Sequence, residues 1–455
     1  MKSNQLEARS LKSEFRIFLI VLLLYSVFCV LNSDAYALDV NKKILANGLT
    51  VLHSEKHNIP VVMVTMIVKA SPLDEPWEKA GLANLVAELL DEGTKNRKSS
   101  EISEEVEFIG ASLSASAGGD YTTITLSVLK KDEEKGFELF SEIILNPIFP
   151  REELDRKREL IKGSLKQREE EPSFLADRAF KKEIFGEHPY GRLVEGSIET
   201  LSAINREDLI KFHSKYFIPN NAILSVVGDL TTDELNSLIK KHLGSWKIAD
   251  MPEKRINPMS EEKTRKLIKI EKDVTQSNIV IGHLGISRDN PDYYAVSVMN
   301  YILGGGGFAS RLMQKIRDDM GLAYDVHSFF TTSKEKGVFQ AGVQTKNESA
   351  NIAIAEILKQ IERIRKENVS DEELSDAKAY LTGSFPRRLD TNRKIADFLA
   401  TVEFYNLGLD YAEKYPSYIN SVTEDDVLRV AKKYLDPENF VLVVVANQKK
   451  AELKY

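Results

Sequence analysis

Two side chains in the C-terminal half of the sequence, Arg317 and Tyr324, have types and a spacing suited to one chemical task. A guanidinium and a phenol both donate hydrogen bonds, so together they can bind an acceptor oxygen of a ligand. Gly321 lies between them and is expected to end a helix. Apolar and polar residues alternate after Gly321, which predicts a strand. The two side chains therefore flank a helix-to-strand corner and can converge on one ligand.

Four consecutive glycines precede this corner: Gly304, Gly305, Gly306 and Gly307. Such a run is too flexible for a regular element, so it predicts a permissive loop where another backbone can come close. A helix should follow, because Leu312, Met313 and Ile316 have the spacing of one apolar face. Glycine-rich corners and helix-end arginines are also common in proteins without a site there. Spacing alone therefore leaves a purely structural interpretation open.

The other residues that could do chemistry do not form a recognisable site. His53 and His57 are four residues apart, but the residues before them predict a strand, which would separate the rings by about 13 Å. The remaining histidines are scattered and are expected on the surface or in the core; they are His188, His213, His242, His283 and His327. The glycine run lacks the Lys-Ser or Lys-Thr of a phosphate loop. The sequence after residue 37 has neither a cysteine nucleophile nor a serine nucleophile elbow.

Residues 1–37 have the composition of a cleavable signal peptide. Basic residues precede an apolar run at 17–31, and Ala35-Tyr36-Ala37 forms a small-x-small cleavage site. We therefore expect this segment to be removed during export. The apolar run is too short, and the residues after it too polar, for a stable membrane span. Retention of the segment as an N-terminal anchor is the alternative.

The composition of the remaining chain limits its partners and its compartment. Export leaves 455 − 37 = 418 residues and changes the net charge from −7 to −8, because four basic and three acidic side chains are lost. A mildly acidic protein lacks the net positive charge that favours binding to the phosphates of nucleic acid. The only cysteine, Cys29, lies in the removed segment, so the mature protein needs no redox chemistry. These features favour a bacterial periplasm.

The chain contains an internal repeat. Residues 152–164 match residues 372–384, an offset of 372 − 152 = 220, and residues 216–224 match residues 434–442, an offset of 434 − 216 = 218. The agreement of the two offsets predicts one α+β unit used twice. Chance similarity of two helix-proline-strand patterns is the alternative.

We expect the two halves at 38–247 and 267–455, joined by a polar, proline-containing linker at 248–266. Strands and helices come in runs rather than in strict alternation. Each half should therefore be a mainly antiparallel sheet with helices packed on one face.

Several motifs resemble the insulinase or pitrilysin-type zinc peptidases, in the branch that includes the mitochondrial processing peptidase. In the C-terminal half these are Ser310-Arg311-Leu312 and Gly321-Leu322-Ala323-Tyr324. In the N-terminal half, Gly81-Leu82-Ala83 to Gly93-Thr94 is similar to the family's zinc helix, and His188-Pro189-Tyr190-Gly191 falls where members have a similar turn. The resemblance covers nearly all of the chain after residue 37.

This resemblance implies two like-folded halves that face each other across a cleft and bind peptide in extended form, with the peptide adding a strand to a sheet edge. It also implies that Arg317 and Tyr324 reach the scissile peptide bond and that the glycine run contacts substrate.

The chain departs from the family at the zinc site. Family peptidases carry His-x-x-Glu-His on the helix opened by Gly-Leu-Ala, because two imidazoles four residues apart hold zinc while the glutamate activates water. Here the two histidine positions are Asn84 and Glu88, and the glutamate position is Ala87. The family's third ligand, a glutamate on a later helix, aligns with Ser164. Zinc needs three good donors and an open position, so we expect no metal on this chain.

These patterns favour a non-zinc subunit of a two-subunit periplasmic peptidase. In such members of the family one chain supplies zinc and base, and the other supplies the Arg–Tyr pair. The resemblance thus implies a homologous partner with an intact His-x-x-Glu-His motif and bound zinc, and peptide substrates. One alternative is a structural or peptide-binding homologue with no part in catalysis. Another is a self-sufficient peptidase, which would require a metal site that the sequence does not reveal.

Overall fold

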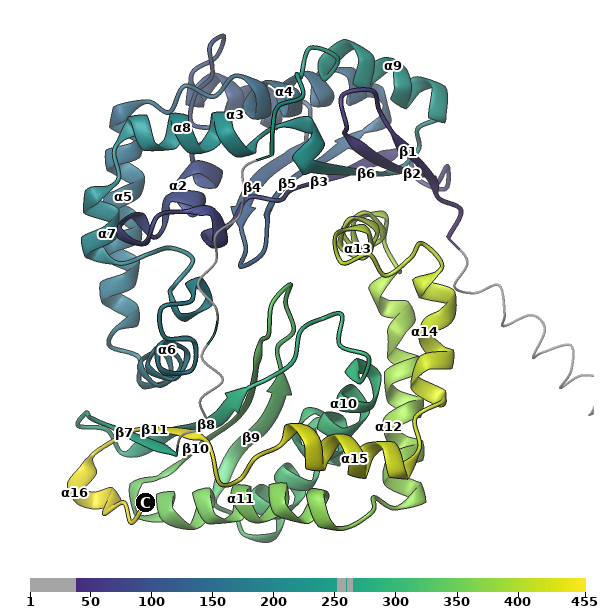
Figure 1. Ribbon diagram of the computed structural model, residues 1–455. Coiled ribbons are helices and arrows are strands. Elements are labelled where there is room, and N and C mark those ends of the chain that lie inside the picture. Colours follow the sequence, from purple (N-terminus) through teal and green to yellow (C-terminus); the bar gives the residue numbers. More distant parts are fainter. Residues whose placement is uncertain (1–37, 252–258, 260–264) are drawn as a thin grey trace, which may run out of the picture.

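The computed structural model describes residues 38–251, 259 and 265–455. Figure 1 shows two halves, each built on one sheet. The N-terminal sheet is six-stranded in the order β1-β2-β6-β3-β5-β4, with β2 and β6 parallel and the other neighbours antiparallel. Its strands are β1 (Asn41–Ile44), β2 (Thr50–Glu55), β3 (Val61–Val68), β4 (Ser112–Ala117), β5 (Thr122–Leu129) and β6 (Ala222–Gly228).

The C-terminal sheet repeats this arrangement. It is five-stranded in the order β7-β11-β8-β10-β9, with β7 and β11 parallel and the other neighbours antiparallel. This order matches β2-β6-β3-β5-β4 strand for strand, so the predicted repeat of one α+β unit is confirmed. The strands are β7 (Lys266–Glu271), β8 (Gln276–Leu284), β9 (Ala323–Phe330), β10 (Val338–Lys346) and β11 (Val441–Ala446).

Most helices of each half pack on one face of its own sheet, where apolar residues at alternate strand positions form the two main cores. In the N-terminal half these helices are α2 (Leu82–Glu88), α3 (Ser99–Phe108), α4 (Glu133–Leu145), α5 (Arg151–Arg168), α7 (Ile198–Ala203), α8 (Arg206–Tyr216) and α9 (Thr232–His242). In the C-terminal half they are α10 (Tyr293–Asn300), α11 (Ala350–Lys366), α12 (Asp371–Ser384), α14 (Tyr411–Asn420), α15 (Glu424–Tyr434) and the short α16 (Gln448–Ala451).

Two helices are exchanged between the halves (Figure 1). Helix α6 (Pro172–Phe185) packs on the other face of the C-terminal sheet, where Phe180 and Val443 belong to one apolar cluster. Helix α13 (Asn392–Phe404) packs on the N-terminal sheet, where Leu399 and Ile223 belong to another. Their first residues are 392 − 172 = 220 apart, the same offset as the sequence repeat. The sequence predicted helices on one face of each sheet, and the exchanged helices add a partial cover to the second face.

A buried carboxylate also joins the halves. Asp120, at the turn between β4 and β5, accepts hydrogen bonds from the hydroxyls of Tyr190 and Tyr405, the latter at 2.8 Å. The backbone N–H of Lys334, in the turn between β9 and β10, donates to the same carboxylate at 2.9 Å. Because Tyr405 and Lys334 belong to the C-terminal half, Asp120 fixes one hairpin turn against the other.

Two predicted segments fall mostly outside the described residues. The signal peptide at 1–37 lies entirely outside them, and the linker at 248–266 lies there except for its ends and residue 259. Strand β7 begins at Lys266, the last residue of the predicted linker. Among the described residues, no helix is long and apolar enough to cross a membrane.

Candidate functional site

The helix that carries Arg317 is wound irregularly. Its apolar side chains Leu312, Met313 and Ile316 are buried as the sequence predicted. The segment η8 (Met313–Asp319) is π-helical, and Gly321 follows it with a φ of 62°. The left-handed conformation of Gly321 explains why the helix ends there. π-Helical turns are rare in proteins and occur frequently at functional sites.

Strand β9 has a bulge beside Tyr324. Val326 pairs with Val343, and Ala323 pairs with Thr345. Strand β9 therefore advances by three residues where β10 advances by two. The extra residue lies at Tyr324 or Asp325, and a bulge of this kind re-aims a side chain. Tyr324 is 87% exposed, whereas Val326 two residues later is fully buried. The bulge therefore directs the phenol to solvent instead of into the core.

The structure brings Arg317 and Tyr324 together and adds a third side chain. The Arg317 Cζ atom lies 5.5 Å from the centre of the Tyr324 ring and 4.7 Å from that of Phe308. Arg317 Nη1 also contacts Asp318 Oδ1 at 3.2 Å. The guanidinium is thus held by two exposed aromatic rings, a geometry that leaves N–H groups free at its edge. Sequence reasoning missed Phe308, although an aromatic residue directly after the glycine run was the available signal.

The glycine run is not the loop that its composition predicted. Gly304 and Gly305 belong to a π-helical turn, η6 (Tyr301–Gly305), and Gly307 begins a 3-10 turn, η7 (Gly307–Ala309). A Cβ on Gly304 would lie 2.6 Å from the Ser328 backbone nitrogen, and one on Gly306 would lie 2.8 Å from the Tyr301 carbonyl oxygen. The prediction that the run is too flexible for a regular element was wrong. The predicted close approach of another backbone is confirmed at Gly304, which lies against the Ser328 backbone.

An ion pair anchors the start of this region. Arg311 is 6% exposed, and its Nε and Nη2 atoms donate to the two oxygens of Glu373 at 2.6 and 2.7 Å. Glu373 lies in the first turn of α12. A bidentate pair of this kind fixes orientation as well as distance. It therefore ties the segment that carries Arg317 to α12.

The positions of the lost zinc motif lie together on α2 and are occupied by other interactions. Asn84 is buried, and its amide donates to Glu88 Oε1 at 3.2 Å. Ala87 is buried, and Ser164 is exposed on α5. Lys157, also on α5, places its ammonium 3.7 Å from Glu88 and 3.2 Å from Glu92.

This donor set does not fit zinc. Asn84 and Glu88 replace the two imidazoles, Ala87 replaces the base and Ser164 replaces the third ligand. The Lys157 ammonium, 3.7 Å from Glu88, neutralises the one carboxylate among them. Within the described residues, no three His, Cys, Asp or Glu side chains are grouped so that they could hold a metal ion.

The rest of the structure around α2 is nevertheless tightly fixed. The Glu75 side chain is fully buried, and its two oxygens accept hydrogen bonds from the backbone N–H groups of Gly81 at 3.1 Å and Ala83 at 3.0 Å. Burial raises the pKa of Glu75 to about 7, although these hydrogen bonds and Arg192 oppose the shift. Sequence reasoning missed Glu75, because its partners are backbone groups.

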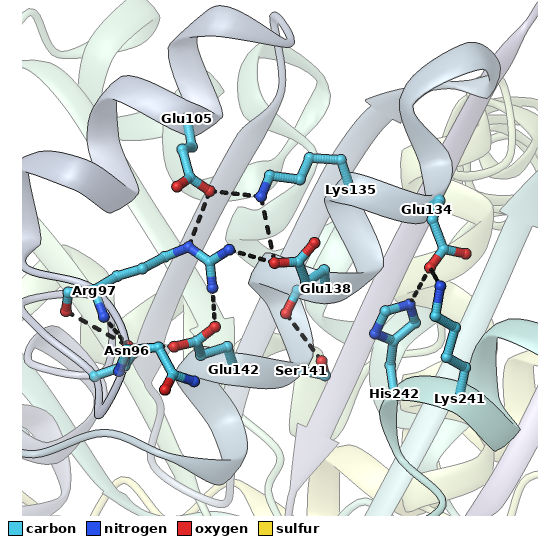
Figure 2. Close-up of polar contacts among 11 residues, drawn as sticks. Asn96, Arg97, Glu105, Glu134, Lys135, Glu138, Ser141, Glu142, Lys241 and His242 are labelled. Atoms are coloured by element: carbon cyan, nitrogen blue, oxygen red, sulfur yellow. Dashed lines mark hydrogen bonds and ion pairs between the residues drawn. The ribbon is translucent and has the colours of Figure 1, made fainter.

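The segment after α2 is fixed by an ion network, which Figure 2 shows. Arg97 donates to Glu105 Oε2 at 2.9 Å and to Glu138 and Glu142. Thr94 donates to the other oxygen of Glu142 at 2.6 Å. Carboxylates from α3 and α4 therefore surround one guanidinium, and the cluster is satisfied internally.

The histidines each have a local partner, which accounts for their positions without a metal. Burial lowers the pKa of both His188 and His213 to about 4. Their hydrogen-bond partners, and those of the others, are as follows: His53 with Thr232, His57 with Asp229, His188 with the Tyr190 N–H, His213 with the Ile144 carbonyl, His242 with Glu134, His283 with the Leu284 carbonyl and His327 with Asp325.

Comparison with known proteins identifies this architecture. Residues 50–197 match the family model described as insulinase (peptidase family M16), and residues 203–381 match the model described as the peptidase M16 inactive domain. The chain belongs to peptidase family M16. This result confirms the resemblance inferred from the sequence.

Individual relatives cover nearly the whole chain. An uncharacterized zinc protease of Rickettsia felis is 27% identical over 401 residues, which cover 86% of this chain and 93% of the relative. A protein of Helicobacter pylori called non-peptidase homolog YmxG is 26% identical over 434 residues, which cover 95% and 99%. The crystal structure of a peptidase M16 inactive domain from Pseudomonas fluorescens has a TM-score of 0.84 and 29% identity, and the match covers 90% of this chain and 98% of that one.

The family and the donor set agree on the class of protein. The chain is an M16 homologue whose own zinc positions, within the residues that the structure describes, carry no suitable set of ligands. The other half presents the cluster of Arg317, Tyr324 and Phe308, in which the two aromatic side chains are exposed and Arg317 is partly exposed.

Proposed function

We propose that this chain is the non-zinc subunit of a two-subunit peptidase and that it places Arg317 and Tyr324 at the zinc site of a homologous partner. The observation that carries the proposal is the construction of the Arg317–Tyr324 pair. A π-helical segment and a β-bulge present the two side chains to solvent, and Tyr324 remains 87% exposed. Irregular backbone of both kinds is typical of functional sites.

The pair is suited to one part of peptide hydrolysis. When a nucleophile attacks the scissile carbonyl, negative charge develops on the oxygen, and donors placed at that oxygen lower the barrier. The Arg317 guanidinium and the Tyr324 hydroxyl can both donate to it. The partner would supply the zinc ion and the base that activates water, since Asn84, Ala87, Glu88 and Ser164 of this chain supply neither.

The topology supports action on a partner instead of on this chain's own α2. The turn after β9 contacts the N-terminal half through Lys334 and Asp120. Tyr324 lies at the opposite end of β9, six residues or about 20 Å before Phe330. The pair therefore lies at the end of β9 that is remote from the Asp120–Lys334 contact.

The substrate would be an extended peptide. Strands β4 and β9 lie at the ends of their sheets, so their outer edges have unpaired backbone groups that can accept an added strand. Residues 1–37 would direct the chain to the periplasm, and the complex would act there on exported peptides or unfolded segments.

The test is reconstitution. The mature chain is purified, mixed with a homologous subunit of the same cell that carries His-x-x-Glu-His, and assayed with quenched fluorescent peptides. We expect no hydrolysis by this chain alone, little by the partner alone, and a rise of at least about 100-fold in the mixture, the effect of adding an oxyanion donor. The proposal would be overturned by a partner whose activity does not change, or by chelator-sensitive hydrolysis by this chain alone.

A further inference from the structure

The ring of Phe308 is the least explained large side chain of the C-terminal half. Phe308 is 67% exposed and Tyr324 is 87% exposed, and both contact the guanidinium of Arg317. Within the described part of that half they are the two most exposed of the large apolar or aromatic side chains, ahead of Ile352 at 49% and Tyr380 at 52%. Exposed aromatic side chains that gather at one point mark a binding surface more often than scattered ones do.

Phe308 is held in place by the turns around it. Gly307 has a φ of 57°, and a Cβ built on it would meet nothing within 4 Å. The three glycines before it pack so closely that a Cβ on each would come within 2.8 Å of Asn300, Tyr301 or Ser328. The Ser310 hydroxyl donates to the Gly307 carbonyl at 2.7 Å and closes the turn from the other side. The ring thus projects from a fixed backbone, and its exposure is not the result of a loose loop.

The two rings lie close enough together to contact neighbouring residues of one extended peptide. The Arg317 Cζ atom lies 4.7 Å from one ring centre and 5.5 Å from the other, so the centres lie no more than about 10 Å apart. Side chains on one face of a strand repeat every two residues, or about 6.6 Å. A residue whose carbonyl oxygen is held by Arg317 and Tyr324 is therefore one or two positions from a side chain that can rest on Phe308.

We propose that Phe308 is a specificity-determining residue, which selects peptides with a large apolar side chain next to the bond whose carbonyl oxygen is bound by Arg317 and Tyr324. The inference rests on the proposed function and goes beyond it by naming the substrate class. One face of the ring contacts the guanidinium, and the rest of its surface is available to an apolar side chain. The contact would bury apolar surface of both the Phe308 ring and the substrate side chain, and this burial is the physical source of the preference.

The experiment uses the reconstituted complex and a set of quenched fluorescent peptides. The peptides are identical except that each position near the cleavage site is in turn Leu, Phe or Ala. Discrimination by an apolar contact is expected to be about 10-fold to 200-fold in kcat/KM. We expect the wild-type complex to prefer Leu and Phe at one position and Phe308→Ala to lose that preference mainly through KM. Phe308→Leu should keep part of it.

Two controls separate this inference from the proposed function. Phe108→Ala removes a phenylalanine that is 91% exposed at the end of α3 in the other half, and it should change nothing. Tyr324→Phe should lower kcat equally for all peptides. If Phe308→Ala keeps the wild-type preference while Tyr324→Phe lowers kcat, the specificity role is wrong and the proposed function stands. The specificity role is also wrong if Phe308→Ala lowers kcat/KM equally for all peptides, because the ring would then only hold Arg317. If neither variant has an effect, the proposed function itself fails.

Discussion

Deprotonation of Glu75 should make the stability of the N-terminal half fall as the pH rises. The carboxylate is fully buried at the start of α2, and burial raises its pKa from 4.5 to about 7. Because the folded state has the higher pKa, it binds the proton more tightly than the unfolded chain does. The stabilisation is thus fully present below pH 4.5 and is lost as the pH rises through 7.

The size of the effect follows from these two pKa values. A pKa of 4.5 in the unfolded chain and about 7 in the folded protein gives a loss of about 2.5 kcal/mol between pH 5 and pH 8. Glu75→Gln removes the titrating group and also replaces one acceptor of a backbone N–H by a donor. The variant should be less stable than the wild type at pH 5, and the difference should shrink by about 2.5 kcal/mol at pH 8.

The assay is urea unfolding of both proteins at four pH values between 5 and 8, followed by circular dichroism. Glu78→Gln is the control, because it removes a carboxylate from the exposed turn three residues later. A difference between Glu75→Gln and the wild type that stays constant within about 0.5 kcal/mol over this range would refute the reasoning, since an ordinary surface carboxylate gives changes of that size.

Three further predictions concern the junction of the halves, the metal and the signal peptide. Asp120→Asn should destabilise the protein by about 2–4 kcal/mol in chemical denaturation, because one oxygen that accepts hydrogen bonds becomes a donor group; an unchanged unfolding midpoint would contradict the role of Asp120. Metal analysis of the dialysed protein should find no stoichiometric zinc, because the α2 positions lack donors and Lys157 lies beside Glu88; one tightly held zinc per chain would contradict this. Mass spectrometry of the protein from cells should find a chain that begins at Leu38, and retention of Met1 would indicate an anchor.

Local sequence patterns were sufficient for much of the fold. The helical segment that buries Leu312, Met313 and Ile316 follows from apolar spacing, and the strand that begins at Ala323 follows from alternation, and both patterns act over a few residues. The internal repeat predicted two like halves, because segments repeated at nearly the same offset indicate a duplicated unit even when the contacts within it are unknown. The exchange of α6 and α13 was not predicted, since amphipathic periodicity shows that a helix has an apolar face but not which sheet covers it.

The site was predicted only in part for the same reason. Arg317 and Tyr324 were found from a motif, and the burial of Ile316 from helical spacing. Lys157 reaches Glu88 only because α5 packs beside α2, and no local pattern encodes that contact. Glu75 was missed because its partners are backbone N–H groups, and Phe308 was missed although it directly follows the glycine run. The glycine run shows the opposite error: composition indicated freedom, whereas Ser328 and Asn300 approach so closely that only glycine fits.

The central claim is that the exposed pair acts on a partner's substrate, and variants of Tyr324 test it most directly. Tyr324→Phe removes one hydroxyl from a side chain that is 87% exposed, so the melting temperature and the assembly of the complex should not change. Tyr380→Phe, in a tyrosine that is 52% exposed on α12, is the matched control.

The measurement is kcat of the reconstituted complex, beside its melting temperature, for wild type, Tyr324→Phe, Arg317→Ala and Tyr380→Phe. We predict that kcat falls by roughly 10²–10³ in the first two variants, because each removes a donor that acts when the oxyanion forms, and that it is unchanged in the third. A normal kcat in both Tyr324→Phe and Arg317→Ala, or a loss of activity that only follows a loss of assembly, would contradict the account.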